Sequence, residues 1–509
     1  MSEKTSSWVG TLGSFVGAVL FVLVGAASAS AQPGPPPPPP LPPLNVPPPN
    51  PLTPQKAILG KILFWDEQLS SDSSVACGSC HMPEFGGSDP RSAMPESIHP
   101  GIDGVVGTAD DVIGSLGIVH QDATGAFVND PVFEHRRQVT GRKTPSSISA
   151  AFTPLLFWDG RATGSFVDPE TGTVVIPAGG ALESQSLGPI LSTTEMGHDG
   201  RTWDEVRTRL QSVTPMALAL ELTPDIEQAL AQFPDYPALF NAAFGTPTIN
   251  ARRIAFAIAS YERTLIPNQT PYDQFAAGVP GALTPQQNQG FQVFVGNCLP
   301  CHGGGNFSDN VFHNIGVRPI ADDSGRQAIT GNPADAGRFR TPTLRNVKLR
   351  APYFHNGGKA TLADVIDFYN QGGEFFVNQD PLINPLGLGP QQRNNLRIFL
   401  EQALTDTRVE QALPPFDRPT LRPYFRRGDA NQDGSFDLAD VTRTLDLLFQ
   451  GAGAPACMDA VDANDDGVID ISDPIAALAR LFAASPALPA PSDVTVGPDP
   501  TADELDCSN

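Results

Sequence analysis

The sequence is poor in cations and in long apolar runs. Its 509 residues contain 32 lysines and arginines against 55 aspartates and glutamates, which gives a net charge of −23. Because an acidic surface repels phosphate, we do not expect nucleic acid as a partner. Beyond the N-terminal region no stretch is apolar enough to span a bilayer. The composition therefore argues against a nucleic-acid-binding protein and against a polytopic membrane protein.

The N-terminus has the pattern of an export signal. Lys4 precedes an apolar run at about residues 15–24, and Ala29-Ser30-Ala31 fits a signal peptidase site. We predict a signal peptide over residues 1–31, with an uncleaved anchor as the alternative because the run is near the short limit for spanning. A proline-rich linker follows over residues 32–52 and is expected to be an extended spacer. The predicted location is the periplasm, the medium or the cell surface.

Only six cysteines are present, and four of them fall in two Cys-x-x-Cys-His runs. In a c-type haem site the two thiols form thioethers with the haem vinyl groups, and the histidine becomes the proximal iron ligand. The alternative is a zinc or redox pair beside a chance histidine, which fits an exported protein less well. We therefore predict two covalent haem c groups. The predicted haem-binding residues are Cys77, Cys80 and His81 in the first run and Cys298, Cys301 and His302 in the second.

Helical periodicity dominates the region between the two runs. Apolar residues recur at helix spacing over residues 203–210, 224–233, 251–265 and 283–295, and no sustained strand-like alternation rivals them. We predict a mainly α protein with two cytochrome-c-like haem domains, an N-terminal one over residues 53–275 and a C-terminal one over residues 276–415. A small helical module is predicted over residues 425–509.

Methionine, the usual soft ligand of an electron-transfer haem, is missing from the region after the second run. No methionine lies between His302 and Met458. A haem iron whose sixth position is filled transfers electrons, whereas an iron with an open position can do chemistry. The remaining candidates for the sixth ligand of the second iron are His313, Tyr353, His355 and Tyr369, and spacing alone does not choose among them.

Several further motifs stand in a fixed order around the haem runs. They are Arg142-Lys-Thr-Pro145, Phe157-Trp-Asp-Gly-Arg161, Leu182-Glu-Ser-Gln185, Glu195-Met-Gly197, Pro342-Thr-Leu-Arg-Asn346 and Pro352-Tyr-Phe-His-Asn-Gly357. Over about residues 52–413 the chain thereby resembles the bacterial dihaem cytochrome c peroxidase and MauG superfamily. The resemblance implies that hydrogen peroxide reacts at the first haem and that electrons arrive through the second. It also implies a donor, either a small cytochrome or cupredoxin or an oxidisable substrate.

The resemblance assigns roles to individual residues around the first haem. Gln185 and Glu195 match a glutamine and a glutamate, ten residues apart, that line the peroxide pocket in the family. A carboxylate there moves a proton between the peroxide oxygens, and an amide orients the peroxide. Trp158 matches an electron relay between the haems. His135 matches a distal histidine that leaves the first iron on activation, with His120 or an open site as alternatives.

Two positions distinguish branches of the family. Tyr369 falls where MauG-type members supply a tyrosine ligand to the second iron and classical peroxidases supply methionine. Lys143 departs from the pattern, because family members often bind calcium between the haem domains through an asparagine there. An ammonium donates hydrogen bonds and cannot ligate a cation, so we expect that calcium site to be absent or altered. MauG-type oxidation of a protein and plain electron transfer stay open as alternative functions.

Acidic residues concentrate in the tail, where 16 aspartates and glutamates from Gly428 onward stand against two arginines. Two copies of a calcium-loop spacing hold much of this charge, each followed by an apolar-faced helix, as in dockerin modules. We expect bound Ca²⁺, a surface or scaffold partner, and a disulfide between the two remaining cysteines, Cys457 and Cys507. The predicted calcium ligands are Asp429, Asn431, Asp433, Asp437 and Asp440 in the first loop and Asp462, Asn464, Asp466, Asp470 and Asp473 in the second.

Overall fold

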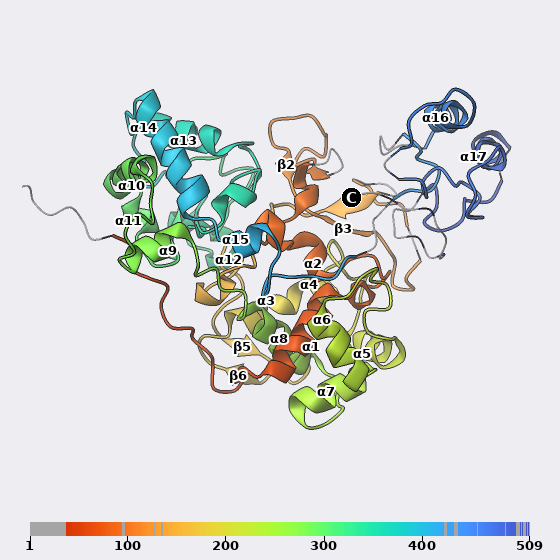
Figure 1. Cartoon of the computed structure of the whole chain (residues 1–509), viewed down its shortest axis with the longest axis horizontal. Coiled ribbons are helices and arrows are strands. Elements are labelled where there is room, and N and C mark those ends of the chain that lie inside the picture. Colours follow the sequence, from red (N-terminus) through yellow and green to blue (C-terminus); the bar gives the residue numbers. More distant parts are fainter. Residues whose placement is uncertain are drawn as a thin grey trace, which may run out of the picture. The chain divides into compact units, whose positions relative to one another are not determined.

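The computed structural model describes residues 37–509 except 94–96, 127, 134–135, 422–424, 432–435, 456, 484, 495–498, 500, 502–504, 506 and 508–509. The predicted signal peptide, His135 and Asp433 therefore lie outside the described residues. The described part of the chain is mainly helical, as predicted, and its strands form short two-stranded pieces (Figure 1). None of the described helices combines the length and apolar character needed to cross a membrane.

The first haem region, which surrounds the Cys-x-x-Cys-His run at residues 77–81, is built on two helices that cross at a glycine. Helix α1 (Pro54–Trp65) packs on α8 (Ala251–Glu262), and the Trp65 indole donates a hydrogen bond to the Tyr261 hydroxyl at 3.1 Å. A Cβ on Gly60 would lie 1.9 Å from the Ala257 carbonyl oxygen, so only glycine permits this approach. The other helices of the region are α2 (Cys77–Cys80), α3 (Ala181–Ser186), α4 (Gly188–Leu191), α5 (Trp203–Ser212), α6 (Pro224–Gln232) and α7 (Tyr236–Phe244).

Short antiparallel strand pairs shape the loops between these helices. They span two to four residues each, which is too short to form a sheet core. The pairs are β1 (Ile98–His99) with β2 (Val112–Ile113), β3 (Leu116–Val119) with β4 (Arg137–Val139), β5 (Phe166–Val167) with β6 (Val174–Ile176), and, in the second haem region, β7 (Phe312–His313) with β8 (Phe339–Arg340).

The second haem region also places a glycine where its two main helices cross. Helix α10 (Pro285–Asn297) packs on α14 (Pro390–Ile398), and a Cβ on Gly290 would lie 2.0 Å from the Asn395 carbonyl oxygen. Helix α10 leads directly into α11 (Leu299–His302), which carries the second haem run. The remaining helices are α9 (Pro271–Ala276), α12 (Gln327–Thr330), α13 (Leu362–Gln371) and α15 (Thr407–Glu410), and a π-helical segment, Phe399–Ala403, continues α14.

The described part of the proline-rich segment lies against the haem regions. The Tyr272 hydroxyl donates to the Pro38 carbonyl oxygen at 2.7 Å, and the buried Asn50 amide donates to Glu183 at 2.8 Å. A Cβ on Gly305 would lie 2.3 Å from the Pro40 carbonyl oxygen. Residues 37–50 are therefore not the extended free spacer that we expected, because the Pro38 carbonyl oxygen and the Asn50 side chain form hydrogen bonds with these regions.

The described tail contains two helices, α16 (Leu438–Phe449) and α17 (Ser472–Phe482), which pack side by side (Figure 1). Val441 and Ala477 are buried between them in one small apolar cluster. Cys457 and Cys507 form the predicted disulfide.

Candidate active site and haem cavities

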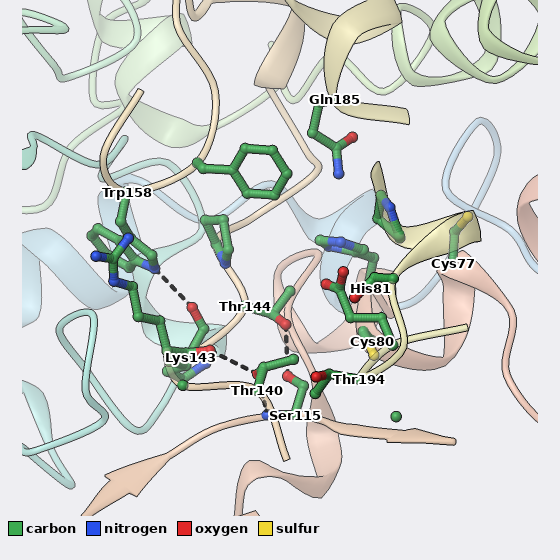
Figure 2. Close-up of a pocket in the computed structure, with 18 of the residues that line it drawn as sticks. Cys77, Cys80, His81, Ser115, Thr140, Lys143, Thr144, Trp158, Gln185 and Thr194 are labelled. Carbon is green, nitrogen blue, oxygen red and sulfur yellow. Dashed lines mark hydrogen bonds between the residues drawn. The ribbon is translucent and has the colours of Figure 1, made fainter. Parts of the chain in front are cut away.

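A cavity of about 530 Å³ surrounds the first Cys-x-x-Cys-His run (Figure 2). Cys77, Cys80 and His81 all line it. The His81 Nδ1 lies 3.0 Å from the Gly87 carbonyl oxygen, so that Nδ1 carries the proton and Nε2 is left for a metal. Burial lowers the pKa of His81, which favours the neutral ring that an iron ligand needs.

A second cavity, of about 230 Å³, surrounds the second run and repeats this arrangement. Cys298, Cys301 and His302 line it. The His302 Nδ1 lies 2.7 Å from the Phe307 carbonyl oxygen, and burial lowers the pKa of this histidine too. Each run thus presents two thiols and one oriented, neutral imidazole to a cavity.

Two guanidinium groups, those of Arg340 and Arg350, line the second cavity. Among the described residues, neither has a carboxylate within 4.0 Å, and the buried Arg350 Nε has no hydrogen-bond partner. Burial lowers the pKa of each to about 10. A buried, unpaired cation is costly unless an anion joins it, and the propionates of a haem are such anions. The residues present therefore fit a haem in this cavity.

Gln185 and Glu195 both line the first cavity, from α3 and from the loop after α4 (Figure 2 labels Gln185). Burial raises the pKa of Glu195 above its usual value, while the Ser192 side chain opposes the shift through a hydrogen bond. A carboxyl group with a raised pKa can accept and return a proton closer to neutral pH. The first cavity is thus lined by the first Cys-x-x-Cys-His run, by the Glu195 carboxyl group with its raised pKa, and by the Gln185 amide.

Trp158 lines both cavities. Its Nε1 donates to the Lys143 carbonyl oxygen at 2.7 Å (Figure 2), and its ring contacts the ring of His355. These two contacts orient the indole between the cavities.

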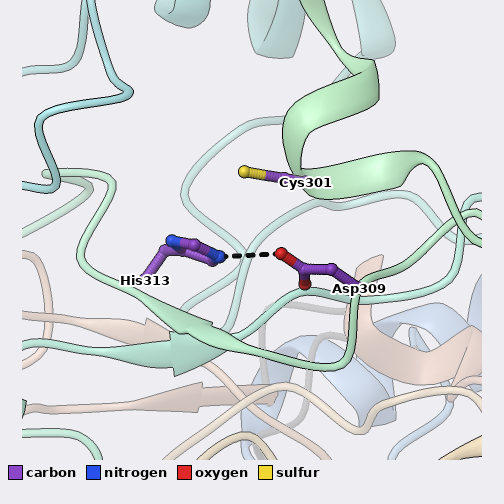
Figure 3. Close-up of side chains that lie close together, drawn as sticks. All are labelled: Cys301, Asp309 and His313. Atoms are coloured by element: carbon purple, nitrogen blue, oxygen red, sulfur yellow. Dashed lines mark hydrogen bonds and ion pairs between the residues drawn. The ribbon is translucent and has the colours of Figure 1, made fainter.

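The four candidate ligands of the second iron, His313, Tyr353, His355 and Tyr369, all line the second cavity. His313 is distinguished by its partners, because Nε2 lies 3.0 Å from Asp309 (Figure 3) and Nδ1 lies 2.7 Å from Asp380. The hydrogen bond with Asp309 is the largest of the causes that raise the pKa of His313 to about 11. An imidazolium held on both nitrogens is a poor iron ligand, so Tyr369, Tyr353 and His355 are the better candidates.

Sequence reasoning missed His99, which lines the first cavity from β1. Its Nδ1 accepts a hydrogen bond from the Gly101 N–H at 3.1 Å. His120, which the sequence suggested instead, lies between two carboxylates at 3.1 Å and 3.3 Å and is not on the cavity wall. The Asp- and Gly-rich stretch after His99 indicates a turn, but no sequence signal places that turn beside the cavity.

Glu262, the last residue of α8, is a second acid group on the first cavity that the sequence did not single out. Its Oε2 is buried and, within the described residues, has no hydrogen-bond partner. Burial raises the pKa of Glu262 to about 8, and the Glu183 carboxylate adds to the rise while Arg263 opposes it. The group is therefore protonated in the folded protein at neutral pH.

In the described part of each predicted calcium loop, two backbone N–H groups donate to the last aspartate. Asp440 and Asp473 occupy equivalent places and are buried, and Asp462 is also fully buried. Burial, with a smaller contribution from the Asp462 carboxylate, raises the pKa of Asp473 to about 7. The matching bonds run from the N–H groups of Asn431 (3.2 Å) and Asp437 (2.8 Å) to Asp440, and from those of Asn464 (3.4 Å) and Asp470 (2.8 Å) to Asp473. Asp429 and Asp466 belong to the same loops.

The chain is similar to known proteins. The family model for di-haem cytochrome c peroxidase matches residues 54–280. The methylamine utilization protein MauG of Methylorubrum extorquens is 31% identical over 366 residues, which cover 70% of this chain and 81% of MauG. The chain belongs to the di-haem cytochrome c peroxidase and MauG family. Cytochrome-c peroxidase IdrP1 of Denitromonas iodatirespirans is 29% identical over 421 residues, which cover 75% of this chain and 90% of IdrP1.

A solved structure of a MauG-like protein associated with microbial copper homeostasis has the same fold. It aligns with a TM-score of 0.52 and 26% identity over 77% of this chain and 98% of its own. Membership of the di-haem cytochrome c peroxidase and MauG family makes this protein an oxidoreductase and implies two c-type haems. It also implies hydrogen peroxide as substrate and a cytochrome as electron donor.

Proposed function

We propose that this member of the family is an exported peroxidase that reduces hydrogen peroxide in the first cavity, with electrons relayed from the second. One observation carries the proposal. The first haem run, Gln185 and Glu195 line one cavity, and Trp158 lines that cavity and the next. A haem attached to each run supplies the iron at which peroxide reacts in the first cavity and electrons are stored in the second.

The side chains of the first cavity then have separate tasks. Glu195 takes a proton from one peroxide oxygen and returns it to the other, so that water can leave. Gln185 donates a hydrogen bond that orients the peroxide. His81, whose Nδ1 is fixed by the Gly87 carbonyl oxygen, would hold the iron through Nε2. Trp158 passes electrons between the two cavities.

In the second cavity we propose thioether bonds from Cys298 and Cys301 and iron ligation by His302 and Tyr369. Arg340 and Arg350 supply positive charge for the propionates. We further propose domain boundaries of 53–275 and 276–415 for the two haem domains and 425–509 for the tail module.

A second candidate function is MauG-type oxidation of a protein substrate. Tyr369 favours it, because a phenolate stabilises ferric iron and makes higher oxidation states more accessible than methionine does. No methionine appears among the described residues that line the second cavity. The reductant distinguishes the two functions: a small cytochrome for the peroxidase and a protein side chain for the MauG-type enzyme.

For the tail we propose a dockerin-like module that binds two Ca²⁺ and attaches the enzyme to a surface or scaffold partner. The proposal of bound Ca²⁺ is supported by three buried carboxylates, those of Asp440, Asp462 and Asp473. Phe449 and Phe482, at the ends of the two helices, are 69% and 72% exposed. Their exposure supports a partner-binding role for this module.

The test of the peroxidase proposal is Glu195→Gln, which keeps hydrogen bonding and removes the proton shuttle. We expect peroxide turnover with a reduced cytochrome donor to fall by roughly 10²-fold or more. Gln185→Ala should cost less. The matched control is Glu227→Gln on the exposed face of α6, which should leave turnover unchanged. Turnover that survives Glu195→Gln would remove Glu195 from the mechanism.

A further inference from the structure

Lys143 is a buried lysine that the proposed peroxide chemistry does not use. Its side chain is 3% exposed, and the residue lines both cavities. Within the described part of the chain no carboxylate lies within 4.0 Å of its Nζ. Burial, assisted by the Arg350 charge and opposed by Asp89, lowers the pKa of Lys143 to about 8, so the ammonium form still predominates at neutral pH. Asp89 itself pairs with Arg91 at 2.9 Å.

The side chain of Lys143 is hydrogen-bonded next to the backbone that orients His81, the predicted proximal ligand of the first haem. Its Nζ donates to the Ser88 hydroxyl at 2.6 Å, and Ser88 in turn donates to the Thr144 carbonyl oxygen at 2.8 Å. Ser88 follows Gly87, whose carbonyl oxygen holds His81. The charge is therefore anchored one residue from the group that orients the proximal histidine.

The peptide of Lys143 leads in the other direction, toward the second cavity. Its carbonyl oxygen accepts from Trp158, and its N–H donates to the His355 carbonyl oxygen at 2.8 Å. Trp158 and His355 both line the second cavity. One residue thus fixes the Trp158 ring (Figure 2) and places a positive charge on the wall of both cavities.

We propose that Lys143 is a positioning residue whose buried charge sets the reduction potentials of both haems together. A fixed positive charge in a low-dielectric site destabilises the ferric form of a nearby haem relative to the ferrous form, because the ferric form carries one more positive charge. The potential of each haem is therefore higher with the ammonium than without it. A cation that lines both cavities shifts the two potentials in the same direction.

The experiment is a spectroelectrochemical titration of both haems in the full-length holoprotein, which rests on the proposed haem attachment. Lys143→Met removes the charge and keeps the length of the side chain. Lys348→Met is the matched control, because it removes the same charge from an exposed lysine paired with Glu410.

We expect Lys143→Met to lower both potentials, each by at least a tenfold change in the reduction equilibrium, which is about 59 mV for one electron. Lys348→Met should leave them close to wild type. Unchanged potentials in Lys143→Met, a shift of one haem only, or an equal shift in Lys348→Met would overturn the proposal. If Lys143→Met does not assemble, Lys143→Gln carries the same expectation.

A haem count separates this proposal from the one on which it rests. Two covalent haems per wild-type chain, with potentials that ignore Lys143, would reject the role of Lys143 alone. Fewer than two haems in the wild-type chain would reject the proposed attachment sites.

Discussion

The ring of Trp158 meets the ring of His355 edge to face, with centroids 6.2 Å apart and an angle of 66° between their planes. His355 in turn stacks on Phe339 with centroids 3.6 Å apart. Trp158 lines the first cavity, and all three rings line the second. A continuous series of ring contacts therefore leads from the proposed peroxide site toward the proposed electron-storage site.

Trp158→Phe tests whether this contact carries electrons. The variant keeps an aromatic ring but loses the hydrogen bond to Lys143 that orients it. We expect the variant to carry two haems as the wild type does. Electron transfer between them should be slower by roughly tenfold or more, since rates fall steeply when a participating ring such as that of residue 158 is misplaced. Rapid-mixing spectroscopy of the half-reduced enzyme with peroxide measures this rate. Trp203→Phe, in α5, is the control, and an equal loss in both variants would argue against a relay.

Sequence spacing could predict residues whose roles are set by local chemistry. Each haem run packs two thiols and a histidine into five residues, and the structure places both runs on cavities. Gln185 and Glu195 could be picked out by the family resemblance, and α3, α4 and the loop after α4 bring both to the first cavity. The duplicated spacing of the tail acids is also a local pattern, and the calcium sites stay a prediction.

Other features depend on contacts between distant segments and have no local signal. His99 and Glu262 lie on the first cavity because a strand pair and the end of α8 fold over it. The close helix crossing at Gly60 needs Ala257, far along the chain. The packing of the proline-rich segment could not be foreseen either, since its composition is equally typical of a solvated linker.

Glu262 makes stability depend on pH in a defined direction. Its pKa is about 8 in the folded protein, against 4.5 for an ordinary glutamate. Between these values the unfolded chain has released the proton and the folded chain retains it. The contribution of Glu262 to stability is therefore complete below about pH 4.5. As the pH rises it decreases, by up to about 1.4 kcal/mol for each pH unit, and it is lost above about pH 8.

Glu262→Gln should remove this dependence, because the amide does not titrate. Thermal unfolding of the holoprotein from pH 5 to 9 measures the effect. The difference in unfolding temperature between the variant and the wild type at pH 5 is the reference. As the pH rises, we expect this difference to change in favour of the variant. Exposed Glu227→Gln should follow the wild type. Parallel curves for wild type and Glu262→Gln would show that Glu262 does not hold its proton.

Tyr369→Phe tests the branch of the family to which the second haem belongs. If the Tyr369 oxygen ligates the second iron, its removal should change the absorption and electron paramagnetic resonance spectra of that haem and leave the first haem unaltered. Tyr353→Phe is the matched control, because Tyr353 lines the same cavity. A spectrum that changes only in Tyr353→Phe, or in neither variant, would reject ligation by Tyr369. In the second case His355, whose Nε2 is buried and has no hydrogen-bond partner in the described structure, becomes the candidate.

The tail should bind two Ca²⁺ per chain and become more stable when it does. In each loop a buried aspartate, Asp440 or Asp473, is held by two backbone N–H groups. A cation that joins these carboxylates binds the folded tail preferentially, so calcium at a hundredfold excess over Kd should stabilise the tail by about 2.7 kcal/mol for each ion bound. Titration calorimetry of the chelator-treated, full-length protein gives the stoichiometry, and scanning calorimetry gives the stability.

Single substitutions separate the two loops. Asp440→Asn and Asp473→Asn should each remove one of the two calcium ions, because each takes a charge from the centre of one loop. Asp446→Asn, which changes an acid on α16 outside the loops, should retain both. Three ions bound to the wild type would indicate that a site near Lys143 persists despite its ammonium. A wild-type protein that binds no calcium, or one whose binding falls equally in Asp446→Asn, would show that the repeated spacing is not a pair of calcium loops.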